Sequence, residues 1–252
     1  MITQTIPLFR ASWKMMLRSR GVIFAVLAAT VQVLVLGLMG DLGFGFGDQT
    51  VNFFDYILPG FAVFLVVYQI QDIMVAVAAS YKARDILKRL ATTPLSPLTF
   101  IGVQTLTYVG LGVTASALVL TIGKLIGGTL AITANLLWLI PLVALVVLTS
   151  IAIAFAIAGL TPNPQTAANV GATISFLLFG FTGVMLPVEA LPGALPKIVP
   201  YVVPYTSLIE AIRGIALTGN SITTYSEQIL IGLVWLAVAF AVAALAYRFT
   251  EE

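Results

Sequence analysis

Stretches without ionisable residues divide this chain into segments of membrane length. The four longest charge-free gaps lie between Arg20 and Asp41, Arg89 and Lys124, Lys124 and Glu189, and Glu227 and Arg248. A helix needs roughly 20 apolar residues to cross about 30 Å of hydrocarbon. The third gap is long enough for two helices, and the turn-forming run at 161–166 divides it. The pattern predicts six transmembrane helices, which cover residues 21–40, 55–79, 98–123, 136–160, 167–186 and 228–247.

The segment before the first of these helices has a different pattern. Cations recur at helical spacing at Arg10, Lys14 and Arg18, and Trp13 belongs to an apolar set on another side. This arrangement is typical of an interfacial amphipathic helix, whose apolar side lies among the lipid headgroups. The alternative is a basic flank that only sets the topology.

The segment before the last helix, residues 187–227, contains five prolines at intervals of four or five residues and still stays strongly apolar. Short broken helices shielded by the other helices fit this composition better than a solvated loop. The expected fold class is therefore an all-α integral membrane protein that forms a single domain over residues 1–252. It has six transmembrane helices, an N-terminal interfacial amphipathic helix and an extracellular re-entrant helical segment.

The basic residues predict the orientation of the chain. With both termini in the cytoplasm, nine of the twelve Lys and Arg residues lie on the inside and three lie outside. The inside set is Arg10, Lys14, Arg18, Arg20, Lys82, Arg84, Lys88, Arg89 and Arg248, and the outside set is Lys124, Lys197 and Arg213. This excess of inside cations predicts a multi-pass protein of the cytoplasmic membrane with both termini inside.

Composition excludes several classes of function. Charged residues make up 9% of the chain, against about 25% in a soluble domain, and hydrophobic residues make up 60%. The chain has no cysteine and no histidine, so it lacks thiol chemistry and the commonest general base and metal ligand. No Gly-rich phosphate loop is present, and the net charge of +2 is too small to indicate a nucleic-acid partner. We expect no enzyme activity, metal site or cofactor on this chain.

Several polar residues lie inside the predicted membrane helices. They are Tyr68, Gln71 and Asp72 in the second helix, and Gln104 and Tyr108 in the third. Polar groups within a membrane face protein or water, so these residues either line a pathway or hydrogen-bond one helix to another. Asp55 and Asp72 are 17 residues apart, about 25 Å along a helix, and we expect them near opposite membrane faces.

The longest cytoplasmic loop, residues 80–97, begins with a basic, helix-compatible half and ends at Pro94 and Pro97, which stop the helix. A short rigid helix of this kind either docks into a soluble partner or only anchors the loop to the headgroups. Charge alone favours the second interpretation, in which the loop is only anchored.

Three motifs resemble a known family. The run at 88–97, KRLATTPLSP, resembles the signature of ABC transporter type-2 permeases, especially the daunorubicin-resistance-like drug exporters. Residues 56–60, YILPG, resemble the entry to the second transmembrane helix in that family. Residues 183–187, together with the prolines that follow and residues 210–215, resemble the outside segment before its last helix.

The resemblance implies functional roles for particular residues. It implies an ATPase-coupling set of Asp85, Lys88, Arg89, Leu90, Thr93 and Pro94, beside an interfacial helix with Arg10, Trp13, Lys14 and Arg18. It also implies an outer gate, to which we assign Glu210 and Arg213, a pair that helical spacing allows to form an ion pair. The implied partners are two ABC ATPase subunits, which use ATP and Mg²⁺, a second permease subunit that is identical or paralogous, and membrane lipid.

The resulting hypothesis is a permease subunit of an ATP-driven exporter that moves a hydrophobic or amphipathic substrate outward, such as a drug, an antibiotic or a lipid-like molecule. Two alternatives stay open: an ion-coupled secondary transporter and an ABC exporter of a lipid-linked glycan. A secondary transporter is expected to show paired charges near the midplane or repeated broken helices.

Overall fold

The computed structural model describes residues 7, 9–14, 18, 20–38, 53–86 and 97–247, with residues 20–26, 38, 97 and 98 described in their backbone only. This part of the chain is helical and contains no strand, which confirms the all-α class. Its long helices are α2 (Arg20–Leu38), α3 (Phe53–Ala83), α5 (Pro97–Leu125), α6 (Leu139–Leu160), α7 (Pro164–Phe181) and α10 (Ser226–Ala246). The shorter elements are η1 (Ala134–Trp138), η2 (Val188–Ala190), α8 (Leu195–Val202), α9 (Thr206–Thr218) and η3 (Ile222–Tyr225).

Four of the described helical segments are long and apolar enough to cross a membrane. They are Phe53–Ala83, Thr99–Leu125, Ala134–Leu160 and Ile222–Ala246. The chain is therefore a multi-pass membrane protein. The other two long helices, α2 and α7, do not meet the same criterion over their described residues. The six-helix count consequently stays a prediction for these two.

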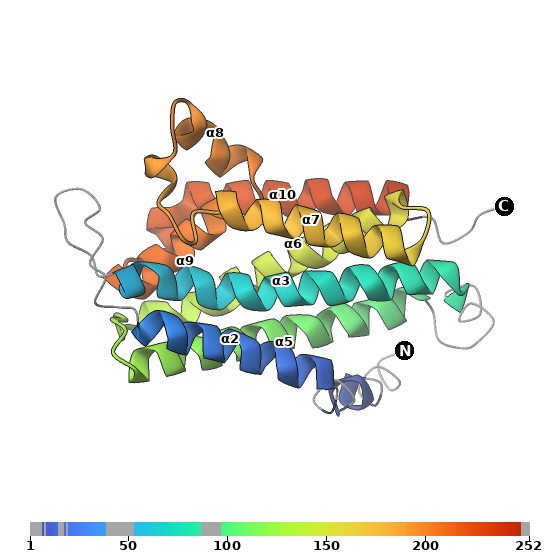
Figure 1. The fold of residues 1–252 in the computed structure, drawn as a ribbon, viewed down its shortest axis with the longest axis horizontal. Helices are drawn as coiled ribbons and strands as arrows, with labels where there is room; N and C mark the ends of the chain where they lie inside the picture. The colour runs from blue at the N-terminus through green and yellow to red at the C-terminus, as the bar shows by residue number, and fades with distance from the viewer. Residues whose placement is uncertain are drawn as a thin grey trace.

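The long helices run side by side along the longest axis of the molecule, and α3 and α6 lie at the centre of the bundle (Figure 1). α6 is apolar on all sides and most of it is buried, as expected for a helix enclosed by others. α10 is equally apolar but leaves most of its surface exposed. We call the two ends of the bundle the Phe53 end and the Ala83 end, after the bounds of α3.

α6 and α10 approach each other most closely at the Ala83 end. A Cβ added to Gly159 would lie 2.6 Å from the carbonyl carbon of Ala246, so only glycine allows the two backbones this separation. The ring of Tyr247 packs edge-on against Phe155, and its hydroxyl donates to the carbonyl oxygen of Ala78 at 2.7 Å. These contacts join α3, α6 and the end of α10.

The bounds of two helices differ from the predicted ones. α3 continues to Ala83, four residues beyond the predicted end at 79, so the first part of the expected loop 80–97 is helical. α7 covers Pro164–Phe181 instead of 167–186. It begins early because Asn163 caps it, accepting a hydrogen bond from the Thr166 amide at 2.8 Å, and because Pro164 is favourable in the first turn. It ends early because Gly183 adopts a positive φ of 71°.

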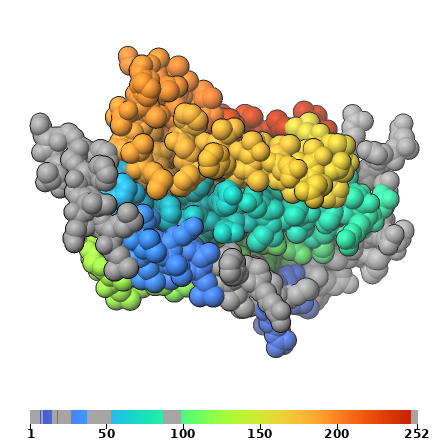
Figure 2. Space-filling view, in the orientation of Figure 1, coloured from blue at the N-terminus to red at the C-terminus, as the bar shows by residue number. Residues whose placement is uncertain are grey.

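Residues 187–227 form short helices at the Phe53 end, as their prolines indicate. α8 projects from the side of the bundle next to α7 (Figures 1 and 2). It is tied down by Tyr201, whose carbonyl oxygen accepts from Trp235 Nε1 at 3.0 Å and whose hydroxyl donates to Glu227 at 3.0 Å. This last hydrogen bond raises the pKa of Tyr201.

α9, in contrast, is packed against α3, α6 and α10 and buries Leu208, Ile209, Ile212 and Ile215. Its position relative to a bilayer stays a prediction.

Candidate functional site

The stretch expected to couple to an ATPase is described only at its start. Arg84 and Asp85 form a turn directly after α3, and both side chains are exposed. Asp85 has a positive φ of 50°, a left-handed conformation that aspartate tolerates better than most residues. The other expected coupling residues, Lys88, Arg89, Leu90, Thr93 and Pro94, lie outside the described residues. Their role stays a prediction.

Lys82 joins the base of this loop to the end of α6. Its Nζ donates to the carbonyl oxygens of Gly159 at 3.0 Å and Thr161 at 3.3 Å. The last carbonyls of a helix lack partners within the helix and attract a cation. From the sequence, Lys82 bears only on the orientation of the chain, because nothing in the local sequence shows which helix end it reaches. A displacement of the loop would act on α6 through this contact.

The expected interfacial helix is partly described, and residues 9–14 are helical. Arg10, Lys14 and Arg18 are exposed, whereas Trp13 is half-buried and stacks on Phe9 with ring centroids 6.0 Å apart. Trp13 packs over Gly110 of α5. Gly110 is 13 residues after Pro97, where α5 begins. The contact with Trp13 therefore lies about 20 Å from the start of α5, within the length of the bundle.

A group of hydrogen-bonded side chains lies between α3, α6, α7 and α9. Buried Gln71 donates from Nε2 to Ser175 Oγ at 2.8 Å, and its Oε1 accepts from the hydroxyl of Tyr205 at 2.8 Å. Ser150 of α6 completes the group, with its Oγ 3.5 Å from the same Oε1. We call Gln71, Ser150, Ser175 and Tyr205 the core polar cluster. Buried polar groups are costly when unpaired, so the cluster holds four helices in one arrangement.

Gln71 bonds one helix to another through the core polar cluster. Its amide is enclosed by protein in this structure, and its role in a pathway stays a prediction. Sequence reasoning missed Tyr205, which lies 134 residues further along the chain. Tyr205 has a positive φ of 78°, an uncommon conformation for a tyrosine. No signal in the sequence pairs it with Gln71.

We expect Gln71→Leu and Tyr205→Phe each to lower the free energy of unfolding by about 1–2 kcal/mol, because each leaves a buried partner without its hydrogen bond. The double variant is expected to lose about 1 kcal/mol less than the sum, since both changes remove the same bond. SDS titration in mixed micelles measures these values. Tyr201→Phe is the control: it removes a hydrogen bond to Glu227 that is exposed, where water can take its place, so we expect a change of less than about 0.5 kcal/mol. Strict additivity of the first two changes would contradict a coupled cluster.

Tyr68 and Asp72 occupy another side of the α3–α7 contact, where both are half-buried. Ser175 Oγ donates to Asp72 Oδ1 at 3.4 Å, and the Tyr68 hydroxyl interacts with the same carboxyl. Ser175 is 11 residues after Pro164, so Asp72 lies about 16 Å from that end of α7. The structure thus places Asp72 inside the bundle, and its expected position near a membrane face stays a prediction.

The two remaining residues of the expected pathway set lie elsewhere. Gln104 and Tyr108 are half-buried on α5, and the hydrogen bonds found for Gln71 and Asp72 include neither of them. The structure therefore brings together Tyr68, Gln71 and Asp72 but not the complete set. Whether any of these residues lines a pathway stays a prediction.

Arg213 of α9 joins three segments at the Phe53 end. Its Nε donates to the carbonyl oxygen of Tyr56 at 2.9 Å, and its Nη2 donates to Gly183 at 2.7 Å and lies 3.5 Å from the carbonyl oxygen of Val184. The guanidinium group also lies 3.9 Å from the centre of the Tyr56 ring. Planar guanidinium groups suit this combination of carbonyl acceptors and an aromatic face.

The expected ion pair between Glu210 and Arg213 is absent from the described structure. Arg213 points at backbone carbonyls of α3 and of the turn after α7, while Glu210 is exposed on α9. Helical spacing allowed the pair, but the nearby carbonyls compete successfully for the guanidinium group. The proposed role of both residues in an outer gate is not tested by this geometry.

Comparison with known proteins adds one finding. The profile of the ABC-2 type transporter family matches residues 3–217 of the chain. This range extends from the N-terminal segment to the last turn of α9 and includes the stretch between α3 and α5. No curated protein matches the chain.

Proposed function

Because the chain belongs to the ABC-2 type transporter family, we propose that this ABC permease subunit moves a hydrophobic or amphipathic molecule outward across the cytoplasmic membrane. The family match carries the proposal. Two separate ATPase subunits, which use ATP and Mg²⁺, supply the free energy for transport. A second permease subunit completes the transmembrane part of the complex. We assign the chain to drug efflux of the daunorubicin-resistance type because the motifs at 56–60 and 88–97 resemble those of that group of exporters.

The proposed orientation puts the Ala83 end in the cytoplasm, since most cations of the chain flank that end. The ATPase subunits then bind the loop between α3 and α5. ATP-dependent movement of this loop reaches α3 directly and reaches α6 through the hydrogen bonds of Lys82. Coupling of this kind requires that the ATPase contact the loop differently in its two states.

The exposed side of α7 supports a second permease subunit. Gln165, Asn169 and Thr173 are exposed and follow one another at intervals of four residues, so they share one face. Polar side chains in a membrane face protein or water more often than lipid. If a second subunit lies against this face, with a substrate pathway between the two subunits, these polar side chains face protein or water and not lipid. α10, which exposes apolar residues, faces the lipid.

Purification of the tagged chain together with the products of its neighbouring genes tests the function. We expect an ATPase to co-elute in a roughly stoichiometric amount, and we expect its ATP hydrolysis to respond to amphipathic substrates. Lys88→Ala combined with Arg89→Ala is expected to lower the response at least about tenfold, because it removes two cations from the docking loop. The response is measured as stimulated over basal ATP hydrolysis in proteoliposomes.

Lys124→Ala combined with Lys197→Ala is the matched control, because it removes the same charge from the opposite end of the bundle and both side chains are exposed. This variant is expected to keep the wild-type response. A folded chain that never binds an ATPase would refute the proposed function. A normal response in the Lys88 and Arg89 variant would refute only the coupling role of those residues.

A further inference from the structure

Asp72 has no cationic partner in the described part of the chain. Its carboxyl group interacts with two hydroxyl groups, those of Ser175 and Tyr68, and no ion pair with a described residue includes it. The nearest cation along α3 is Lys82, whose Nζ bonds to α6 instead. Asp72 is therefore an acidic residue inside the bundle whose charge no described residue balances.

An unbalanced carboxylate at this depth is costly. Ionisable side chains within membrane helices are rare, and those that occur are paired or lie on the path of a substrate or ion. A hydrogen bond to Ser175 does not explain the residue, since a neutral asparagine or serine accepts the same bond without the cost of desolvating a charge. Asp72 therefore lacks a cation that would offset this cost among the described residues.

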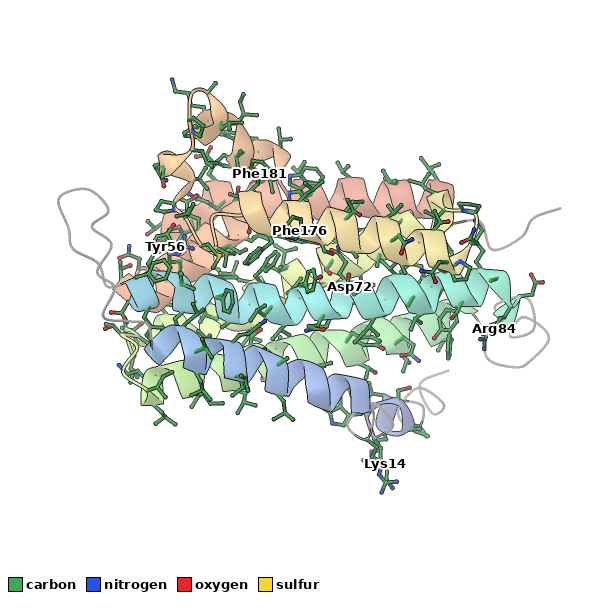
Figure 3. All side chains as sticks on the ribbon, in the orientation of Figure 1. Lys14, Tyr56, Asp72, Arg84, Phe176 and Phe181 are labelled. Carbon is green, nitrogen blue, oxygen red and sulfur yellow. The ribbon has the colours of Figure 1, made fainter. Side chains whose placement is uncertain are left out.

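One aromatic side chain, Tyr68, contacts Asp72, and further aromatic side chains lie along the same α3–α7 contact. Tyr68 lies one turn away and stacks with Phe64, with ring centroids 6.2 Å apart, and Phe64 contacts Phe179 of α7 at 5.2 Å. Phe176 follows Ser175 on α7 and is 73% exposed. Figure 3 shows Asp72 on α3 and Phe176 on the adjacent α7, and Figure 2 shows that these two helices lie side by side on one face of the molecule.

A carboxylate next to aromatic side chains favours one chemical class of ligand. Aromatic faces attract cations and also bind apolar groups, and a single carboxylate next to one of them supplies one negative charge. A neutral lipid or a polyanion gains nothing from that charge. An amine or onium ion that carries aromatic or aliphatic groups satisfies both the carboxylate and the apolar walls.

We propose that Asp72 is the anchor of a binding site for a cationic amphipathic substrate, with Tyr68 and Phe176 against its apolar part. The site rests on the proposed function, since it narrows the class of molecules that the permease moves. Half-burial of Asp72 leaves the carboxyl reachable from the exposed face of the α3–α7 contact. Binding supplies the missing cation, so substrate charge determines affinity.

Binding of tetraphenylphosphonium to the full chain tests the site without an ATPase. The protein is placed in phosphatidylcholine nanodiscs, which carry no net lipid charge, and empty nanodiscs correct for partition into lipid. Triphenylphosphine oxide serves as a neutral competitor with similar rings. We expect the phosphonium ion to bind the wild-type chain at least about tenfold more tightly than the oxide. Equal affinity for the cation and the neutral compound would overturn the proposal, whatever the variants do.

Variants of Asp72 provide the second measurement. Asp72→Asn keeps the shape and the hydrogen-bond acceptor, and we expect it to weaken phosphonium binding roughly tenfold or more while binding of the oxide is unchanged. Asp72→Glu keeps the charge and is expected to restore most of the affinity. Asp55→Asn is the control, because Asp55 lies on the same helix about 25 Å away and asparagine still accepts from the Thr129 amide. Wild-type affinity in a folded Asp72→Asn chain would overturn the proposal.

These outcomes are separable from those that test the proposed function. Charge-dependent binding without any ATPase partner would support the site and refute the ATP-driven exporter. ATPase coupling that responds equally to cationic and neutral amphiphiles would support the exporter and refute the site.

Discussion

Replacing Arg213 with methionine is expected to lower the free energy of unfolding by about 3 kcal/mol. The change keeps an unbranched apolar stem but removes the hydrogen bonds by which the guanidinium group ties α9 to α3 and to the turn after α7. The carbonyl oxygens of Tyr56 and Gly183 lose a charged donor, and the Tyr56 ring loses the cation on its face. SDS titration in mixed micelles measures the loss.

Lys197→Met is the matched control for this prediction, because it removes a cation from the same outer segment at an exposed position of α8. We expect it to change the free energy of unfolding by less than about 0.5 kcal/mol. Arg213→Lys is expected to recover only part of the stability, since an ammonium group does not match the planar fork of arginine. Equal stability of the Arg213→Met and Lys197→Met chains would show that Arg213 does not hold the three segments together.

Gly159→Ala is expected to cost about 2–3 kcal/mol, although it adds a single methyl group to a helix. The added Cβ would lie 2.6 Å from the carbonyl carbon of Ala246 and 2.7 Å from the amide nitrogen of Tyr247. These are backbone atoms, so no side chain can rotate away, and α10 must move from α6. Thermal unfolding in detergent and the yield of monodisperse protein both report the effect.

Gly180→Ala is the control for Gly159→Ala. Gly180 is also helical, but a Cβ added there meets no atom within 4 Å. Alanine restricts the unfolded chain more than glycine does, so this variant is expected to be as stable as the wild type or up to about 1 kcal/mol more stable. If both substitutions had the same effect, close contact between α6 and α10 at Gly159 would be contradicted.

The helical class of this protein could be predicted because it depends on local properties of the sequence. Charge-free gaps indicate helices of membrane length, and the run at 161–166 indicates where α6 and α7 separate. The exact bounds were harder to predict because short-range chemistry decides them. Asn163 and Pro164 start α7 earlier than hydropathy indicates. The positive φ of Gly183 ends the same helix earlier than hydropathy indicates.

The partners of the polar residues could not be predicted in the same way. Helical periodicity places Glu210 and Arg213 on one side of a helix, yet it contains no information about carbonyl groups 157 residues earlier in the chain. Gln71 was recognised as an intramembrane polar residue, but its bond to Tyr205 depends on how α9 packs against α3. Such pairs are set by tertiary packing, which one sequence does not reveal. The loop residues at 88–94 lie outside the described structure and add no test of their own.

The contact between α7 and α3 has a mechanical consequence. α7 buries a narrow row of small side chains, Ala167, Gly171 and Ser175. Small side chains form shallow ridges, so this part of the contact resists axial sliding less than the part where Phe179 packs against Phe64. Ser175 sets the register, since its hydroxyl bonds to Gln71 and Asp72 together. A shift of α7 along its own axis breaks both of these bonds at once. Gln71 and Asp72 thus hold α7 in one axial position through Ser175. When these two hydrogen bonds break, the environment of Asp72 changes in the same step.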